Sequence, residues 1–172
     1  MPTFSRFGPA AVLLAGSLAM SACASKAPKE LPPEPGPATT TEAPTGTLGP
    51  VPGSHADFLA FTQGDDTIYF DTDRYNIDSV DAAALTKQAE WLNRYPAKGA
   101  TIEGHCDERG TRDYNLALGE RRANAAKNYL VGLGIAPARL TTVSYGKERP
   151  VALGSNESAW AQNRRAATIT ID

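Results

Sequence analysis

The stretch NLALGERRANAAKNYL, residues 115–130, predicts a helix with two distinct faces and is the clearest indication of the fold. At about 100° per residue, Leu116, Gly119 and Ala123 fall on one side of this helix. Gly119 and Ala123 are small enough to let that side lie close against a sheet. We therefore expect strands before and after this helix, and a fold in which helix and sheet pack together.

Short β-rich segments alternate with helical ones around residues 115–130. Strands are expected at four places: residues 67–70, 101–105, 140–145 and 166–171. A further helix is expected from Ser79, whose hydroxyl can cap it, to Pro96, which stops it, and a short polar helix at residues 157–163. This alternation predicts an α/β (α+β) sandwich with the helices on one face of a small sheet.

Residues 1–22 have the organisation of a bacterial export signal. Arg6 supplies the positive charge, and residues 10–20 (AAVLLAGSLAM) form an apolar run that is too short to span a membrane. The segment ends in MSAC, which resembles a lipobox, with Met20 where Leu is more usual. We expect cleavage before Cys23 and acylation of its thiol. The alternative is an ordinary signal peptide that happens to end near a cysteine.

Acylation would make Cys23 a membrane anchor. A diacylglycerol and an N-acyl chain together anchor stably, because each buried CH₂ contributes ~0.8 kcal/mol. Ala24 follows the cysteine, and by resemblance the absence of Asp there points to the outer membrane, on its periplasmic face. No cofactor is expected besides this covalent lipid.

Residues 23–53 are expected to be a lipidated N-terminus followed by a disordered linker. They are rich in Pro, Thr, Gly and Ala, so the burial of apolar side chains cannot offset the entropy of ordering them. Such a tether reaches about 30 Å as a flexible coil and about 90 Å in the polyproline conformation. The alternative is a disordered tail that does not serve as a spacer. The folded domain is expected at residues 54–172.

Charge and cysteine content exclude several classes of function. The net charge of -2, without a basic run, argues against nucleic acid as a partner. Cys23 and Cys106 are not expected to form a disulfide, since a Pro-rich stretch separates the first from the domain. The two histidines and two cysteines lack the spacing of zinc ligands, so no metal site is expected.

Polar residues converge near the start of the predicted helix at residues 115–130. Asn115, Leu118 and Arg122 share a helix face that adjoins the loop containing Asp107. Asp107 and Arg122 can form a plain salt bridge. Alternatively, Asp107 takes an ammonium group while Arg122 holds a carboxylate in its bidentate fork, which would suit an amino-acid-like zwitterion.

Residues 105–108 (HCDE) also raise the possibility of an enzyme. If the strand continues through His105, adjacent side chains point to opposite faces, so His105 cannot easily activate the thiol of Cys106. Cys106 is more simply a small residue at a strand end and a free thiol. We therefore expect no catalytic residue.

Several separated motifs carry a resemblance to a known family. They occur in this order: residues 68–71 (IYFD), 75–77 (YNI), 103–111 (EGHCDERGT), 114–123 (YNLALGERRA), 143–150 (VSYGKERP) and 163–166 (NRRA). Over residues 66–171 the chain resembles OmpA-like domains, and among them most nearly the peptidoglycan-associated lipoproteins. The resemblance implies a βαβαβ-type domain with helices on one face of a small mixed sheet.

The resemblance also implies a site and partners. The family binds the diaminopimelate of the peptidoglycan stem peptide without catalysis, and Asp107 and Arg122 would clamp its amino and carboxylate ends. The residues that would line the same pocket are Phe70, Asp71, Cys106, Asn115 and Leu118. Cys106 departs from the family pattern, in which Ala or Thr is expected.

As a second partner, the family implies TolB of the Tol system, through a surface that overlaps the peptidoglycan site. The chain would then tether the outer membrane to the wall and support envelope integrity and cell division. Two alternatives remain open: an OmpA-like lipoprotein that anchors another envelope complex, and a wall hydrolase, for which the sequence offers no activated nucleophile.

Overall fold

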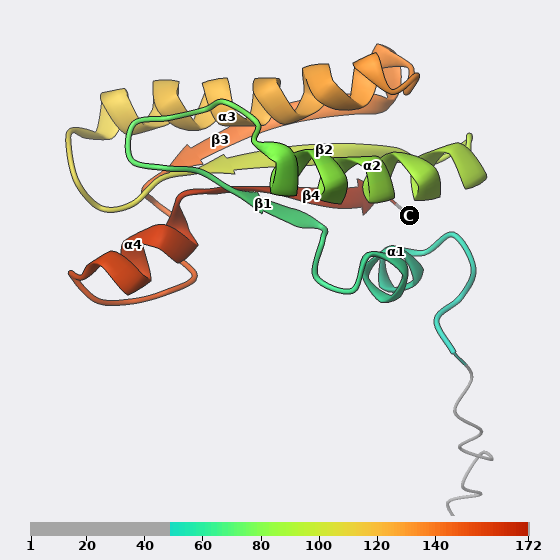
Figure 1. Cartoon of the computed structure of the whole chain (residues 1–172), viewed down its shortest axis with the longest axis horizontal. Coiled ribbons are helices and arrows are strands. Elements are labelled where there is room, and N and C mark those ends of the chain that lie inside the picture. The colour runs from blue at the N-terminus through green and yellow to red at the C-terminus, as the bar shows by residue number, and fades with distance from the viewer. Residues whose placement is uncertain (1–48, 172) are drawn as a thin grey trace, which may run out of the picture. The chain divides into compact units, whose positions relative to one another are not determined.

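A four-stranded mixed sheet organises the part of the chain that the computed structural model describes, residues 49–171 (Figure 1). Its strands are β1 (Thr67–Tyr69), β2 (Gly99–His105), β3 (Leu140–Gly146) and β4 (Arg165–Ile171). They are ordered β1-β4-β2-β3, with β4 antiparallel to β1 and β2, and β2 parallel to β3. The strand nearest the C-terminus therefore lies between the first two strands, and the expected α/β architecture is confirmed.

Two long helices, α2 (Ser79–Arg94) and α3 (Arg112–Gly132), cover one face of the sheet (Figure 1). α4 (Glu157–Asn163) and a 3₁₀ turn (Pro137–Arg139) lie in the connections before β4 and β3. None of the helices in residues 49–171 is long and apolar enough to cross a membrane.

α1 (His55–Thr62) covers the edge of β4 that the short strand β1 leaves unpaired. The backbone N–H of Thr170 donates to Nδ1 of His55, at 3.3 Å. The ring of Phe58 packs edge-on against Trp91 of α2, with centroids 5.2 Å apart. α1 thus extends the core to this edge.

The core fills the space between the sheet and the two long helices. Its fully buried members include Ile68 and Ile102 from the strands, Leu85 and Leu92 from α2, and Leu130 from α3. Apolar side chains that alternate along the strands meet those at helical spacing, and their removal from water is the main stabilising contribution.

A contact between two glycines brings α3 against the carboxyl end of β2. A Cβ on Gly104 of β2 would overlap the carbonyl oxygen of Gly119, and a Cβ on Gly119 would overlap the hydroxyl of Ser144 in β3. That hydroxyl donates to the carbonyl of Leu116, at 2.7 Å. The small face expected on this helix is confirmed, and it places the first turns of α3 beside the loop that follows β2.

Some element ends differ from the expectation. The expectation that Ser79 caps α2 is wrong: the side chain of Asp78 accepts from the N–H groups of Val80 and Asp81, and Ser79 is the first helical residue. α3 begins at Arg112, earlier than residue 115, because the side chain of Thr111 caps it.

α1 is not indicated by the sequence pattern, because its eight residues have no clear apolar periodicity. The export signal, Cys23 and most of the linker, at residues 1–48, lie outside the described residues.

Replacing Gly104 with Ala should lower the free energy of unfolding by about 2–3 kcal/mol, since the new methyl group meets a rigid backbone carbonyl. Gly132→Ala is the matched control: it lies at the end of α3, where the described residues place no atom beyond its own stretch of helix within 4 Å of the new methyl group, and should stabilise by ~0.5–1 kcal/mol. Urea unfolding measures both. Equal stability of the two variants would contradict the close approach.

Candidate functional site

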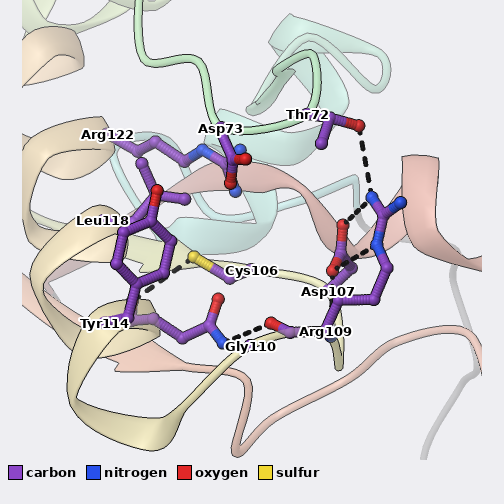
Figure 2. Close-up of a pocket in the computed structure, with 10 residues that line it drawn as sticks. Thr72, Asp73, Cys106, Asp107, Arg109, Gly110, Tyr114, Leu118 and Arg122 are labelled. Carbon is purple, nitrogen blue, oxygen red and sulfur yellow. Dashed lines mark hydrogen bonds and ion pairs between the residues drawn. The ribbon is translucent and has the colours of Figure 1, made fainter.

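A pocket of about 230 Å³ lies between the loop after β2, the first turns of α3 and the loop after β1 (Figure 2). Five predicted site residues line it: Cys106, Asp107, Asn115, Leu118 and Arg122. Its other lining residues are Thr72, Asp73, Arg109, Gly110 and Tyr114. The structure therefore brings most of the predicted site together.

Phe70 and Asp71 lie next to this pocket and line an adjacent one of about 370 Å³. Both still contact Arg122. The ring of Phe70 is 5.2 Å from the guanidinium carbon, and the backbone carbonyl of Asp71 accepts from Nη2 at 3.0 Å. In this structure Phe70 and Asp71 therefore support Arg122. They are not part of the lining of the first pocket, where they were expected.

Arg122 is fully buried and holds three backbone carbonyls at once. Nε donates to Arg74 at 2.9 Å, Nη1 to His105 at 2.8 Å and Nη2 to Asp71 at 3.0 Å. Burial lowers the pKa of Arg122, but a guanidinium keeps its charge in proteins. The pocket wall therefore carries a fixed positive charge whose orientation is set by the main chain.

Asp107 is the negative group of the pocket and is 7% exposed. Its Oδ2 lies 2.6 Å from Nη2 of Arg109 and 3.5 Å from Nη1 of Arg164. Burial acts to raise the pKa of Asp107, but the side-chain and backbone hydrogen bonds from Arg109 outweigh it, and the pKa is lowered. Asp107 is therefore ionised, and its ion pairs are with Arg109 and Arg164 in place of the direct salt bridge to Arg122 that the sequence left open.

Asn115 fixes the shape of the loop that carries Asp107. Its buried Nδ2 donates to the carbonyls of Arg109, at 2.7 Å, and Thr111, at 3.0 Å. Leu118, 5% exposed, supplies an apolar wall one turn further along α3. The pocket thus offers opposite charges on Asp107 and Arg122 with an apolar surface between loop and helix, an arrangement that can hold a zwitterion.

Cys106 is a buried, protonated thiol at the pocket floor. Burial raises its pKa to about 11, and Sγ donates to the carbonyl of Asn115 at 3.3 Å. His105 lies on the other face of the sheet, where its ring packs 5.5 Å from that of Tyr145. The two side chains diverge as expected, so His105 is not placed to take the proton of the Cys106 thiol. Within residues 49–171, no three acidic, His or Cys side chains cluster as metal ligands would.

The sequence pattern missed Arg109, Arg164 and Asp73 as parts of the site. Asp73 interacts electrostatically with Arg122 and adopts φ 56°, an uncommon backbone conformation for a residue other than glycine. Arg109 follows Asp107 by two residues in a loop, where no periodicity predicts which side chains meet. Only the fold brings Arg164 to Asp107, since 57 residues separate them.

His105 should make folding stability depend on pH. Burial lowers its pKa from 6.5 to about 4, with further lowering by Arg165 and Arg149. Neither ring nitrogen has a hydrogen-bond partner among residues 49–171, although Nε2 lies 3.4 Å from a carboxylate oxygen of Glu103. Because the unfolded chain binds this proton more readily, the stabilisation is complete above pH 6.5 and is lost as the pH falls toward 4.

Between pH 7 and 4.5, wild type should lose on the order of 2 kcal/mol more unfolding free energy than His105→Phe. Phe keeps a ring against Tyr145 but binds no proton, and the carboxylates that titrate in this range are common to both proteins. Denaturant unfolding at several pH values measures the difference. Parallel pH profiles would show that His105 keeps its ordinary pKa.

The chain is similar in sequence to proteins of a known family. The OmpA family model matches residues 69–164. A peptidoglycan-associated lipoprotein from Rhizobium meliloti (strain 1021) is 47% identical over 169 residues, which cover 98% of this chain and 90% of the relative. One from Haemophilus influenzae is 49% identical over 100 residues, or 58% of this chain and 65% of the relative.

Solved structures share the fold. The crystal structure of the peptidoglycan-associated lipoprotein from Burkholderia pseudomallei has a TM-score of 0.60 and 46% identity, covering 61% of this chain and 89% of that one. The C-terminal domain of Helicobacter pylori MotB has a TM-score of 0.58 at 18% identity, covering 62% of this chain and 84% of that one. The second likeness concerns the fold alone.

Proposed function

Because the chain belongs to the OmpA family and its relatives are peptidoglycan-associated lipoproteins, we propose that it is an outer-membrane lipoprotein that holds the peptidoglycan stem peptide through diaminopimelate. Binding is non-covalent and no bond of the wall is broken. The protein thereby tethers the outer membrane to the wall.

One observation carries the proposal: ionised Asp107 and charged Arg122 line the same small pocket, each more than nine-tenths buried. The free end of a diaminopimelate side chain bears an ammonium and a carboxylate on one carbon. Charge-assisted hydrogen bonds to the two groups would fix both the position and the stereochemistry of that carbon. The raised pKa of Cys106 supports a binding role over a hydrolytic one.

The lipid end of the tether rests on the sequence around Cys23. The small residues before it and the apolar run before those support a diacylglycerol and an N-acyl chain on this residue, with the domain on the periplasmic face of the outer membrane. The Pro-rich linker then sets the distance between membrane and wall.

The partner in the Tol system is TolB, by extension from the family, and it competes with the wall for the pocket side of the domain. Alternation between the two partners would link this protein to envelope integrity during cell division. Co-purification with TolB discriminates this role from the anchoring of another envelope complex.

Purified mature chain should sediment with peptidoglycan sacculi, and free diaminopimelate should compete. Asp107→Asn removes the charge with little change of shape and should weaken binding about tenfold or more, as expected for a lost charge-assisted hydrogen bond. Glu120→Gln, on the exposed side of α3, is the matched control and should bind like wild type.

Circular dichroism of each variant verifies the fold. The proposal fails if Asp107→Asn sediments as well as wild type and diaminopimelate does not compete.

Mass spectrometry of the mature protein should find an acylated cysteine at the N-terminus. Cys23→Ser should lack the lipid and leave the membrane fraction, because no acceptor thiol remains at the cleavage site. Cys106→Ser is the matched control and should remain lipidated. A mature chain that starts with unmodified Cys23 or Ala24 would contradict the anchor.

A further inference from the structure

We propose that Arg109 is a latch on the pocket: its guanidinium holds the carboxylate of Asp107 in the place that a ligand ammonium needs, and must release it for the ligand to bind. This inference rests on the proposed function, in which Asp107 receives that ammonium. It concerns how tightly the site can bind, and what controls access to it.

The carboxylate of Asp107 already uses its hydrogen-bond acceptor positions within the protein. A carboxylate has about four acceptor positions on its two oxygens. Oδ1 accepts from the backbone N–H of Arg109 at 3.0 Å and from its Nε at 3.1 Å. Oδ2 accepts from Nη2 of Arg109 at 2.6 Å and from Nη1 of Arg164 at 3.5 Å. An incoming ammonium must therefore replace one of these donors.

The side chain of Arg109 is the donor that can leave. Arg164 is 6% exposed and fixed by the carbonyl of Phe70, at 2.9 Å, and by Glu157, at 2.6 Å. The backbone of Arg109 is fixed as well, since its carbonyl accepts from Asn115. Its side chain, in contrast, is 38% exposed, and the rotation of its own dihedral angles suffices to free Asp107.

The guanidinium of Arg109 has a second partner besides Asp107. Its central carbon is 4.3 Å from the ring centroid of Trp160, a residue of α4 outside the pocket lining. The indole N–H of Trp160 donates to Glu108 at 3.1 Å, which fixes the ring. This cation–π contact does not involve Asp107, so it can persist when the bonds to Asp107 break and still stabilise the charge of Arg109.

Release would also loosen the pocket mouth. Nη2 of Arg109 donates to the hydroxyl of Thr72 at 3.2 Å, which links the loop after β2 to the loop after β1 across the pocket (Figure 2). That second loop contains Asp71 and Arg74, whose carbonyls hold Arg122. The latch therefore bridges the elements that position both charges of the site.

Titration calorimetry of the full mature chain in detergent, with a diaminopimelate-containing muropeptide as the probe, tests the latch. Arg109→Gln should bind the muropeptide about three- to tenfold more tightly than wild type at pH 7, because the internal competitor is gone. Arg112→Gln is the matched control: it removes a nearby arginine that pairs with Glu148 and should leave the affinity unchanged.

Two further readouts separate a latch from a general structural effect. On an Asp107→Asn background, Arg109→Gln should no longer raise the affinity, because the two residues act through one contact. The single variant Arg109→Gln should also lose binding at a higher pH than wild type on acidification, since bonds from Arg109 lower the pKa of Asp107. Thermal unfolding establishes that each variant is folded.

The outcomes distinguish this inference from the proposed function. Weaker or unchanged binding by folded Arg109→Gln, with wild type bound normally, would overturn the latch and leave the wall-binding function standing. An absence of muropeptide binding by wild type would overturn both. Tighter binding that persists on the Asp107→Asn background would also refute the latch, because it would not depend on Asp107.

Discussion

The buried guanidinium of Arg122 is the interaction on which the arrangement of the site depends. It extends from α3 and donates hydrogen bonds to the last carbonyl of β2 and to two carbonyls of the loop after β1. An unpaired buried carbonyl is costly in a packed interior, so the bonds from Arg122 stabilise the segments that carry these carbonyls. One side chain therefore satisfies the backbone of two separate segments and keeps a positive charge at the pocket wall, so the atoms that hold the structure together are those that we propose recognise the ligand.

The rest of the site follows from how closely α3 approaches the sheet. Gly104 and Gly119 lack the side chains that would keep the helix away from the sheet. The hydroxyl of Ser144 holds the first turns of α3 in place through its hydrogen bond to the carbonyl of Leu116. Asn115 then shapes the loop of Asp107 from the same helix. Cys106 occupies the floor of this narrow space as a small protonated residue. Burial disfavours the reactive thiolate of Cys106, and the narrow space requires a small side chain.

The sequence allowed prediction of features that depend on periodicity. The face of α3 with Gly119 and the adjoining face with Asn115, Leu118 and Arg122 follow from helical spacing, and the strands follow from alternation. Features that depend on loop conformation or distant pairing could not be predicted in this way. Arg109 folds back on Asp107 within a loop, and Arg164 reaches it from the C-terminal cap of α4. The cap of α2 is decided by whether Asp78 or Ser79 has the extended backbone.

If the domain is tethered as proposed, α1 has a mechanical consequence. The described chain enters the fold through this helix, which is held to β4 by His55 and to α2 by Phe58 and by the bond from Trp91 to Asp57. Tension along the proposed linker would load these contacts before any strand, while β4 stays paired with β2 along its length. The pocket lies at the other end of the sheet, beyond the carboxyl end of β2. Strain at the point of attachment would thus be absorbed away from the residues that we propose to bind the wall.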